Sequence, residues 1–161
     1  MPMHTGTRAA RATLFAAAFP LLLAAALAHA QAVQVSDAWV RATVPGQKVA
    51  AAYMTLRSSA AARLVGVKTK AARSAEIHSM SHEGGVMKMR RLESLELPAG
   101  QEVALEPGGN HIMLFDPVKP LEEGQRVALK LVVEQGGRRA ELSVDAPVRS
   151  ADFGEGAHKH H

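Results

Sequence analysis

The sequence predicts a single all-β domain, built as a sandwich or a Greek-key barrel. Short runs that alternate apolar and polar residues, or are rich in β-branched residues, recur from residue 33 onward. Clusters of Gly, Pro and Asn separate these runs at roughly regular intervals, as in sandwiches and barrels. No segment after residue 30 has a convincing long helical period.

Residues 1–30 are typical of a secretory signal peptide rather than of the fold. Arg8 and Arg11 supply a positive start, Ala12–Leu27 is an apolar run, and Ala28-His29-Ala30 is a small-x-small cleavage sequence. A membrane anchor is the alternative. The run is short for a spanning helix, and Pro20 breaks it. We therefore expect export, with cleavage near Ala30.

Nine strands are predicted, each bounded by turn residues. In order, they are Val33–Ala42, Ala51–Arg57, Leu64–Lys68, Ala75–Met80, Val86–Leu92, Glu102–Leu105, His111–Phe115, Arg126–Glu134 and Arg139–Asp145. The turns that separate them include Pro45-Gly46, Gly84-Gly85, Pro98-Ala99-Gly100, Pro107-Gly108-Gly109-Asn110, Asp116-Pro117 and Gly136-Gly137. Two alanine-rich stretches, 50–52 and 60–62, leave short helical turns open as an alternative.

Core positions follow from the same pattern. The late strand Arg126–Glu134 places Val127, Leu129, Leu131 and Val133 on one face, as a half-buried strand requires. The other candidate core residues are Trp39, Tyr53, Leu56, Leu95 and Leu114. From Ser150 the hydrophobic pattern stops, so we expect a β domain over residues 31–149 and a flexible tail over 150–161.

Charge and composition exclude several classes of function. Without the signal peptide, 17 basic and 15 acidic residues remain, a net charge of only +2, and no basic stripe with interleaved aromatics indicates nucleic-acid binding. The sequence has no cysteine, which excludes a thiolate nucleophile, a Cys-type zinc site, an iron–sulfur cluster and a blue-copper centre. It shows no evident acid–base pair or cofactor motif, so we do not expect an enzyme.

Methionine and histidine are concentrated between residues 78 and 113. This segment holds four of the five methionines that follow the signal peptide, together with three histidines: Met80, Met87, Met89, Met113, His78, His82 and His111. A neutral, soft thioether suits Cu(I), whereas zinc sites use Cys, His and carboxylate, and Ca²⁺ and Mg²⁺ prefer oxygen. The ligand types therefore favour Cu(I).

Strand geometry brings these donors together. Residues two apart on a strand share a face, so His111 and Met113 point the same way. A hairpin turning at Glu83-Gly84 would place Met80 opposite Met87 and His78 opposite Met89, about 5 Å apart at Cβ. If the strand that begins at His111 approaches this surface, a four-ligand site closes.

The spacing of four of these residues resembles a known motif. His78, ten residues, Met89, 21 residues and His111-x-Met113 look like the motif of the periplasmic PCuAC copper chaperones, over about residues 38–148. This resemblance implies a cupredoxin-like β-barrel with one Cu(I) near the surface, held by these four residues. It also implies delivery of copper to the CuA centre of cytochrome c oxidase, in subunit II, directly or through a second copper chaperone.

The remaining donors have simpler interpretations beside the metal-binding one. Met54 is expected in the core, because a methionine on a strand is usually core filler. His82 is expected to face solvent at the turn. Met80 and Met87 are interpreted either as a hydrophobic rim or as alternative thioether ligands that help to pass copper on.

The end of the chain is also rich in histidine. His158, His160 and His161 form a tract that could bind a second copper as Cu(II), because nitrogen-rich sites without thioethers favour that state. A solvated tail or a cloning remnant is the alternative. For the whole protein, the alternatives to a chaperone are a periplasmic copper storage or resistance protein, a copper enzyme and a metal-free adhesion module.

Overall fold

The computed structural model describes residues 33–150 and 152, and all of its regular elements are β-strands. The predicted signal peptide and nearly all of the predicted tail, His158, His160 and His161 included, lie outside these residues. The strands are β1 (Val33–Arg41), β2 (Val49–Ser58), β3 (Ala62–Thr69), β4 (Ala72–Glu83), β5 (Val86–Leu92), β6 (Leu95–Leu97), β7 (Glu102–Leu105), β8 (His111–Pro117), β9 (Arg126–Gln135) and β10 (Arg138–Arg149). Within the described part, no helix is long and apolar enough to cross a membrane.

Each of the nine predicted strands is present, and the all-β prediction is confirmed. The short strand β6 was missed, and the alanine-rich stretch 50–52 belongs to β2 rather than to a helical turn. Strand β4 is longer than predicted and runs through Met80 to Glu83. This extension matters for the site described below.

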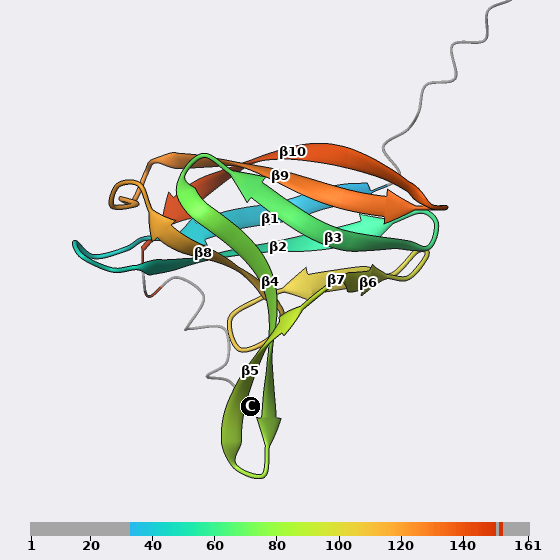
Figure 1. The fold of residues 1–161 in the computed structure, drawn as a ribbon, viewed down its shortest axis with the longest axis horizontal. Helices are drawn as coiled ribbons and strands as arrows, with labels where there is room; N and C mark the ends of the chain where they lie inside the picture. The colour runs from blue at the N-terminus through green and yellow to red at the C-terminus, as the bar shows by residue number, and fades with distance from the viewer. Residues whose placement is uncertain (1–32, 151, 153–161) are drawn as a thin grey trace, which may run out of the picture.

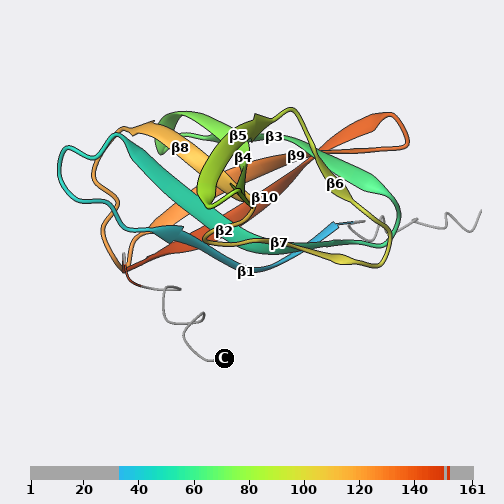
Figure 2. The ribbon, with the colours of Figure 1, turned by 90° about the horizontal axis from the view of Figure 1, so that it is seen from below.

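The strands pair in the order β5-β4-β8-β2-β1-β10-β9-β3-β6, with β7 also paired to β2. Most neighbours are antiparallel, but β1 and β10 pair in parallel and join the two halves of the sheet. In Figure 1, β9 and β10 run along one side of the body and β7 along the other, and Figure 2 shows β2 crossing in front of β10. The sheet therefore folds over into two layers.

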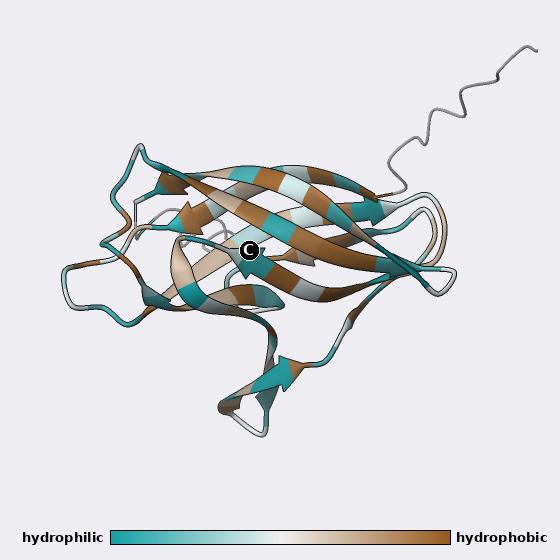
Figure 3. Ribbon diagram, turned by 45° about the horizontal axis from the view of Figure 1, so that its top comes forward, coloured by the Kyte–Doolittle hydropathy of each residue, from teal (hydrophilic) through white to brown (hydrophobic). Residues whose placement is uncertain are grey.

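The core lies between these layers. Apolar and polar residues alternate along the strands in Figure 3. On β9, Val127, Leu129, Leu131 and Val133 are buried, as predicted. The other predicted core residues are buried too: Trp39, Tyr53, Met54, Leu56, Leu95 and Leu114. Alternation on a twisted sheet thus fixes which side chains of β4 and β8 face outward.

A charged cluster on the outer surface connects three strands of one layer. Glu134 on β9 accepts hydrogen bonds from Arg139 on β10, at 3.0 Å, and from Arg63 on β3. These two bonds hold the pKa of the Glu134 carboxyl below its usual range, because both guanidinium groups favour the ionised form. This cluster is built from β3, β9 and β10, whereas the methionine-rich hairpin is built from β4 and β5.

One hairpin leaves the body of the sheet. Strand β8 pairs with β4 only as far as His78, and beyond that point β4 continues with β5 alone. Figure 1 shows this β4–β5 hairpin projecting away from the other strands. The hairpin carries Met80, His82, Met87 and Met89.

Candidate metal-binding site

The site begins with three strands that lie side by side. In the sheet, β5, β4 and β8 are consecutive neighbours. His78 of β4 is directly opposite His111 of β8. Two residues further along the strands, on the same face, Glu76 is opposite Met113. Between them on each strand, Ile77 and Ile112 are buried in the core. Period-two alternation therefore places His78, His111 and Met113 together on the outer face.

The hairpin register differs from the predicted one. The turn is formed by Gly84-Gly85, both with positive φ (59° and 80°), so Met80 lies opposite Met89 and His82 opposite Met87. The predicted turn at Glu83-Gly84, with His78 opposite Met89, is wrong. A two-residue turn with positive φ at both positions strongly prefers glycine, and Glu83 would be strained there. Each residue of β4 is therefore paired two residues further along β5 than predicted. Because side chains alternate with a period of two, the side chains predicted to share one face of the hairpin still do so.

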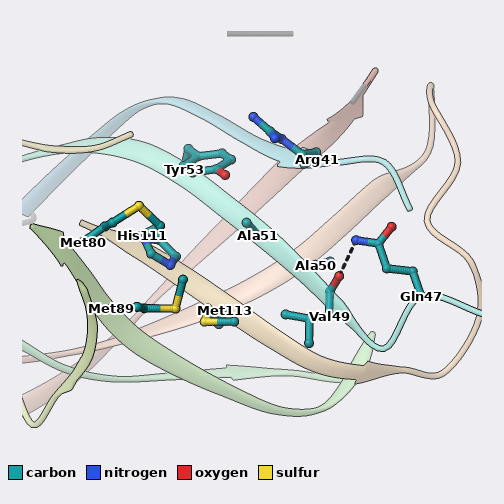
Figure 4. Close-up of a pocket in the computed structure, with 10 residues that line it drawn as sticks. All are labelled: Arg41, Gln47, Val49, Ala50, Ala51, Tyr53, Met80, Met89, His111 and Met113. Atoms are coloured by element: carbon teal, nitrogen blue, oxygen red, sulfur yellow. Dashed lines mark hydrogen bonds between the residues drawn. The ribbon is translucent and has the colours of Figure 1, made fainter. Parts of the chain in front are cut away.

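A shallow cavity of about 270 Å³ lies on this face. It is lined by Arg41, Gln47, Val49, Ala50, Ala51, Tyr53, Met80, Met89, His111 and Met113. Figure 4 shows the side chains of Met80, Met89 and Met113 gathered around the imidazole of His111. Three sulfurs and one imidazole that are spread over 34 residues of sequence therefore share one cavity.

His111 is held in a defined orientation. Its Nδ1 lies 2.9 Å from the carbonyl oxygen of Gly109, which also accepts a hydrogen bond from the backbone N–H of Met80. A carbonyl can only accept, so Nδ1 carries the proton and Nε2 keeps its lone pair in the neutral ring. The residue is only 5% exposed. Gly109 thus fixes both the ring and the strand that brings Met80 to it.

His78 lies next to this cavity rather than among its lining residues. The centres of the His78 and His111 rings are 6.0 Å apart, with 30° between their planes. Nε2 of His78 is 2.9 Å from Oε2 of Glu76, and Oε1 of the same carboxylate is 3.6 Å from Arg91. An ionised carboxylate accepts hydrogen bonds, so Nε2 donates and Nδ1 carries the lone pair.

That Nδ1 atom is unusual among the described residues. It is buried and has no hydrogen-bond partner in the structure. A buried acceptor without a partner is costly, and it demands an explanation such as an ion that it binds. The Glu76–His78 pair has the form of the carboxylate–histidine arrangement that orients imidazole ligands in metal sites.

The chemistry of the lining selects the kind of ion. Arg41 is the one charged side chain among the lining residues of this cavity, and no carboxylate lines it. Hard cations such as Ca²⁺ and Mg²⁺ need oxygen ligands. In the described part of the chain, no three His, Cys, Asp or Glu side chains form a group that could hold a metal. The arrangement therefore fits a soft ion of low charge that thioethers and imidazoles can hold.

Sequence reasoning found some of this site and missed the rest. Met80 was left between two interpretations, and the structure places it in the cavity. Glu76 was missed, although its position two residues before His78 would have revealed it by the same face rule. Arg41 and Tyr53 come from β1 and β2, and no local pattern points to them. His82 is exposed near the turn, as predicted.

Comparison with known proteins identifies the family. Residues 33–148 match the family model described as "LpqE-like: Putative lipoprotein LpqE-like". The chain belongs to the LpqE-like family. A protein of this kind from Leifsonia xyli subsp. xyli, "Putative lipoprotein Lxx21020", is 37% identical over 109 residues, which is 67% of this chain and 66% of that protein. The match thus spans just under two thirds of that relative.

Solved structures extend the comparison for this LpqE-like chain. The copper-bound PCuAC domain from PmoF2 is 30% identical, with a TM-score of 0.60, over 74% of this chain and 93% of that one. The solution structure of CuI-DR1885 from Deinococcus radiodurans is 34% identical, with a TM-score of 0.59, over 76% and 83%. The apo form of DR1885 is 32% identical, with a TM-score of 0.57, over 93% and 97%. The predicted cupredoxin-like fold is confirmed.

Proposed function

We propose that this LpqE-like protein is an exported Cu(I) chaperone whose ligands are His78, Met89, His111 and Met113. The observation that carries the proposal is the shared cavity of Met89, His111 and Met113, with the ring of His78 6.0 Å from that of His111. Metal–imidazole bonds of about 2.0–2.1 Å put the centres of two rings on one ion roughly 5–6 Å apart. The copper-bound PCuAC domain from PmoF2 and CuI-DR1885 support copper as the cargo.

The donor set favours Cu(I) over other ions. Thioether sulfur is soft and neutral, and the two imidazoles bind in their neutral form, so the site adds no negative charge that would hold a harder cation. The two free lone pairs are on different ring atoms, Nε2 of His111 and Nδ1 of His78, because each ring donates its other N–H. A second site for Cu(II) at His158, His160 and His161 stays a prediction.

The exposure of the donors suits transfer rather than permanent storage. His111 is 5% exposed, whereas Met89 is 47% exposed on the projecting hairpin. An acceptor can therefore contribute its own ligand while the inner histidine still holds the ion. This is ligand exchange, not bond-making catalysis, and no enzymatic activity is proposed. The acceptor we propose is the CuA site of cytochrome c oxidase subunit II, or a second chaperone that serves it.

Export is part of the same proposal. The relatives are described as lipoproteins. The sequence of residues 1–30 has the features of a secretory signal peptide, and we propose cleavage near Ala30 and a periplasmic location.

An anaerobic Cu(I) titration against a competing chelator tests the proposal. We expect one ion to bind tightly and the variants Met113→Leu and His111→Ala to weaken that binding by more than the roughly 10–100-fold that loss of an outer partner costs. Met54→Leu is the matched control, because Met54 is a buried core methionine that does not line the cavity, and leucine replaces its thioether with little change of volume. Several ions bound with similar affinity would instead indicate a storage protein.

A further inference from the structure

The β4–β5 hairpin has two chemically different faces. On one face, Glu83 accepts hydrogen bonds from Ser81, Lys88 and Arg90. The opposite face has its ion pairs at the base of the hairpin, where Glu76 contacts His78 and Arg91, and presents sulfur and imidazole toward the tip. The two cross-strand pairs nearest the tip on this face are Met80 with Met89 and His82 with Met87.

Packing does not explain the outer of these two pairs. Met87 is 51% exposed and His82 is also exposed, near the tip of a hairpin that pairs with no other strand there. A methionine in a core fills space, but Met87 has no core to fill. Directly opposed residues have Cβ atoms about 4.5–5.5 Å apart, so one soft ion can be shared between the Met87 sulfur and the His82 imidazole.

The outer pair is in line with the inner site. Met80 and Met89 are two residues inward on the same face, about 7 Å along the strands, and both line the cavity with His111 and Met113. Exposure falls in the same direction, from Met87 through Met89 at 47% to His111 at 5%. The donors thus form a series from solvent to the buried histidine.

We propose that His82 and Met87 form a second, weaker Cu(I) site, and that copper enters and leaves the inner site through it by way of Met80 and Met89. This inference rests on the proposed function, since it takes the inner site as the end of the path. At each step one sulfur or nitrogen binds as another leaves. The ion stays Cu(I), and neither an electron nor an oxidant is required.

The test uses the full chain with methyl-labelled methionine, titrated with Cu(I) alone under anaerobic conditions and followed by NMR. We expect the first equivalent to shift the methyl signals of Met89 and Met113, and a second, weaker equivalent to shift that of Met87. Met87→Leu and His82→Asn should each abolish the second equivalent without changing the affinity for the first. Transfer of the first ion to a chelator should slow several-fold in the same variants, whereas Met54→Leu should change nothing.

The outcomes separate this inference from the proposed function. A first equivalent that binds normally, with a second that is missing or leaves Met87 unshifted, overturns the outer site alone. Unchanged transfer rates in both variants overturn its role as the path. In His111→Ala the tight equivalent should be lost while the weak shift of Met87 persists, and loss of both would show that no independent outer site exists.

Discussion

His78 is the residue whose environment says most about the site. Its Nδ1 is buried without a partner, while Nε2 is held by Glu76 at 2.9 Å. The carboxylate is 26% exposed and also lies 3.6 Å from Arg91, so it is anchored from both sides. Partners of this kind fix the orientation of an imidazole and raise its basicity as a ligand.

Removing the charge of Glu76 should therefore weaken metal binding without removing a ligand. For Glu76→Gln we expect a loss of roughly 10–100-fold in Cu(I) affinity, the usual cost of losing an outer partner of a ligating histidine. Glu102→Gln is the matched control, because Glu102 forms an exposed pair with Arg57 at 3.9 Å. Equal affinities of the two variants in chelator competition would show that Glu76 does not position His78.

For single residues, the sequence predicted which side chains supply donor atoms better than it predicted the hydrogen-bond partners of those side chains. The choice of His78, Met89, His111 and Met113 followed from ligand softness and from the resemblance, and the structure brings these residues close together. The carbonyl of Gly109 could not be predicted as a partner of His111, because every residue has such a carbonyl and only the loop conformation selects one.

Among the elements, the β4–β5 hairpin determines where the thioethers lie. Its turn, Gly84-Gly85, has φ values of 59° and 80°. The β9–β10 hairpin turns on Gly136-Gly137 with nearly the same values, 56° and 75°, and no atom would crowd a Cβ at any of these four positions. The two turns differ mainly in what their strands carry.

This similarity gives a controlled test of the hairpin. Gly85→Ala and Gly137→Ala should each cost about 1 kcal/mol or somewhat more in unfolding free energy, since a side chain disfavours positive φ. Only Gly85→Ala should also lower Cu(I) affinity, because β5 carries Met89. Thermal unfolding and Cu(I) competition measure the two effects. A similar loss of affinity in Gly137→Ala would mean that general destabilisation, not hairpin geometry, is the cause.

The β4–β5 hairpin was predicted in part from the sequence. Alternation and the glycine pair predicted a hairpin and its soft face. The predicted turn was placed one residue too early along the chain. Glu83-Gly84 and Gly84-Gly85 both contain a glycine, and only the need for positive φ at both turn positions favours Gly84-Gly85. The extension of β4 from Met80 to Glu83 was also missed, since no residue there is buried to mark it as part of a strand.

On the scale of the whole molecule, the strand order makes the site. Donors at positions 78, 89, 111 and 113 become neighbours because β5, β4 and β8 are adjacent in the sheet. The sequence predicted the all-β class from local patterns. It did not predict the parallel pairing of β1 with β10, because this contact joins segments more than 100 residues apart.

X-ray absorption at the copper edge, with one equivalent of Cu(I) on the full chain, reads out whether thioethers and imidazoles bind the same ion. We expect a mixed shell, with nitrogen at about 2.0 Å and sulfur at about 2.3 Å, taking metal–ligand bonds of ordinary length. The sulfur contribution should fall in Met113→Leu and stay unchanged in Met54→Leu. A shell of nitrogen or oxygen alone would contradict a site in which thioethers from β5 and β8 meet on one ion.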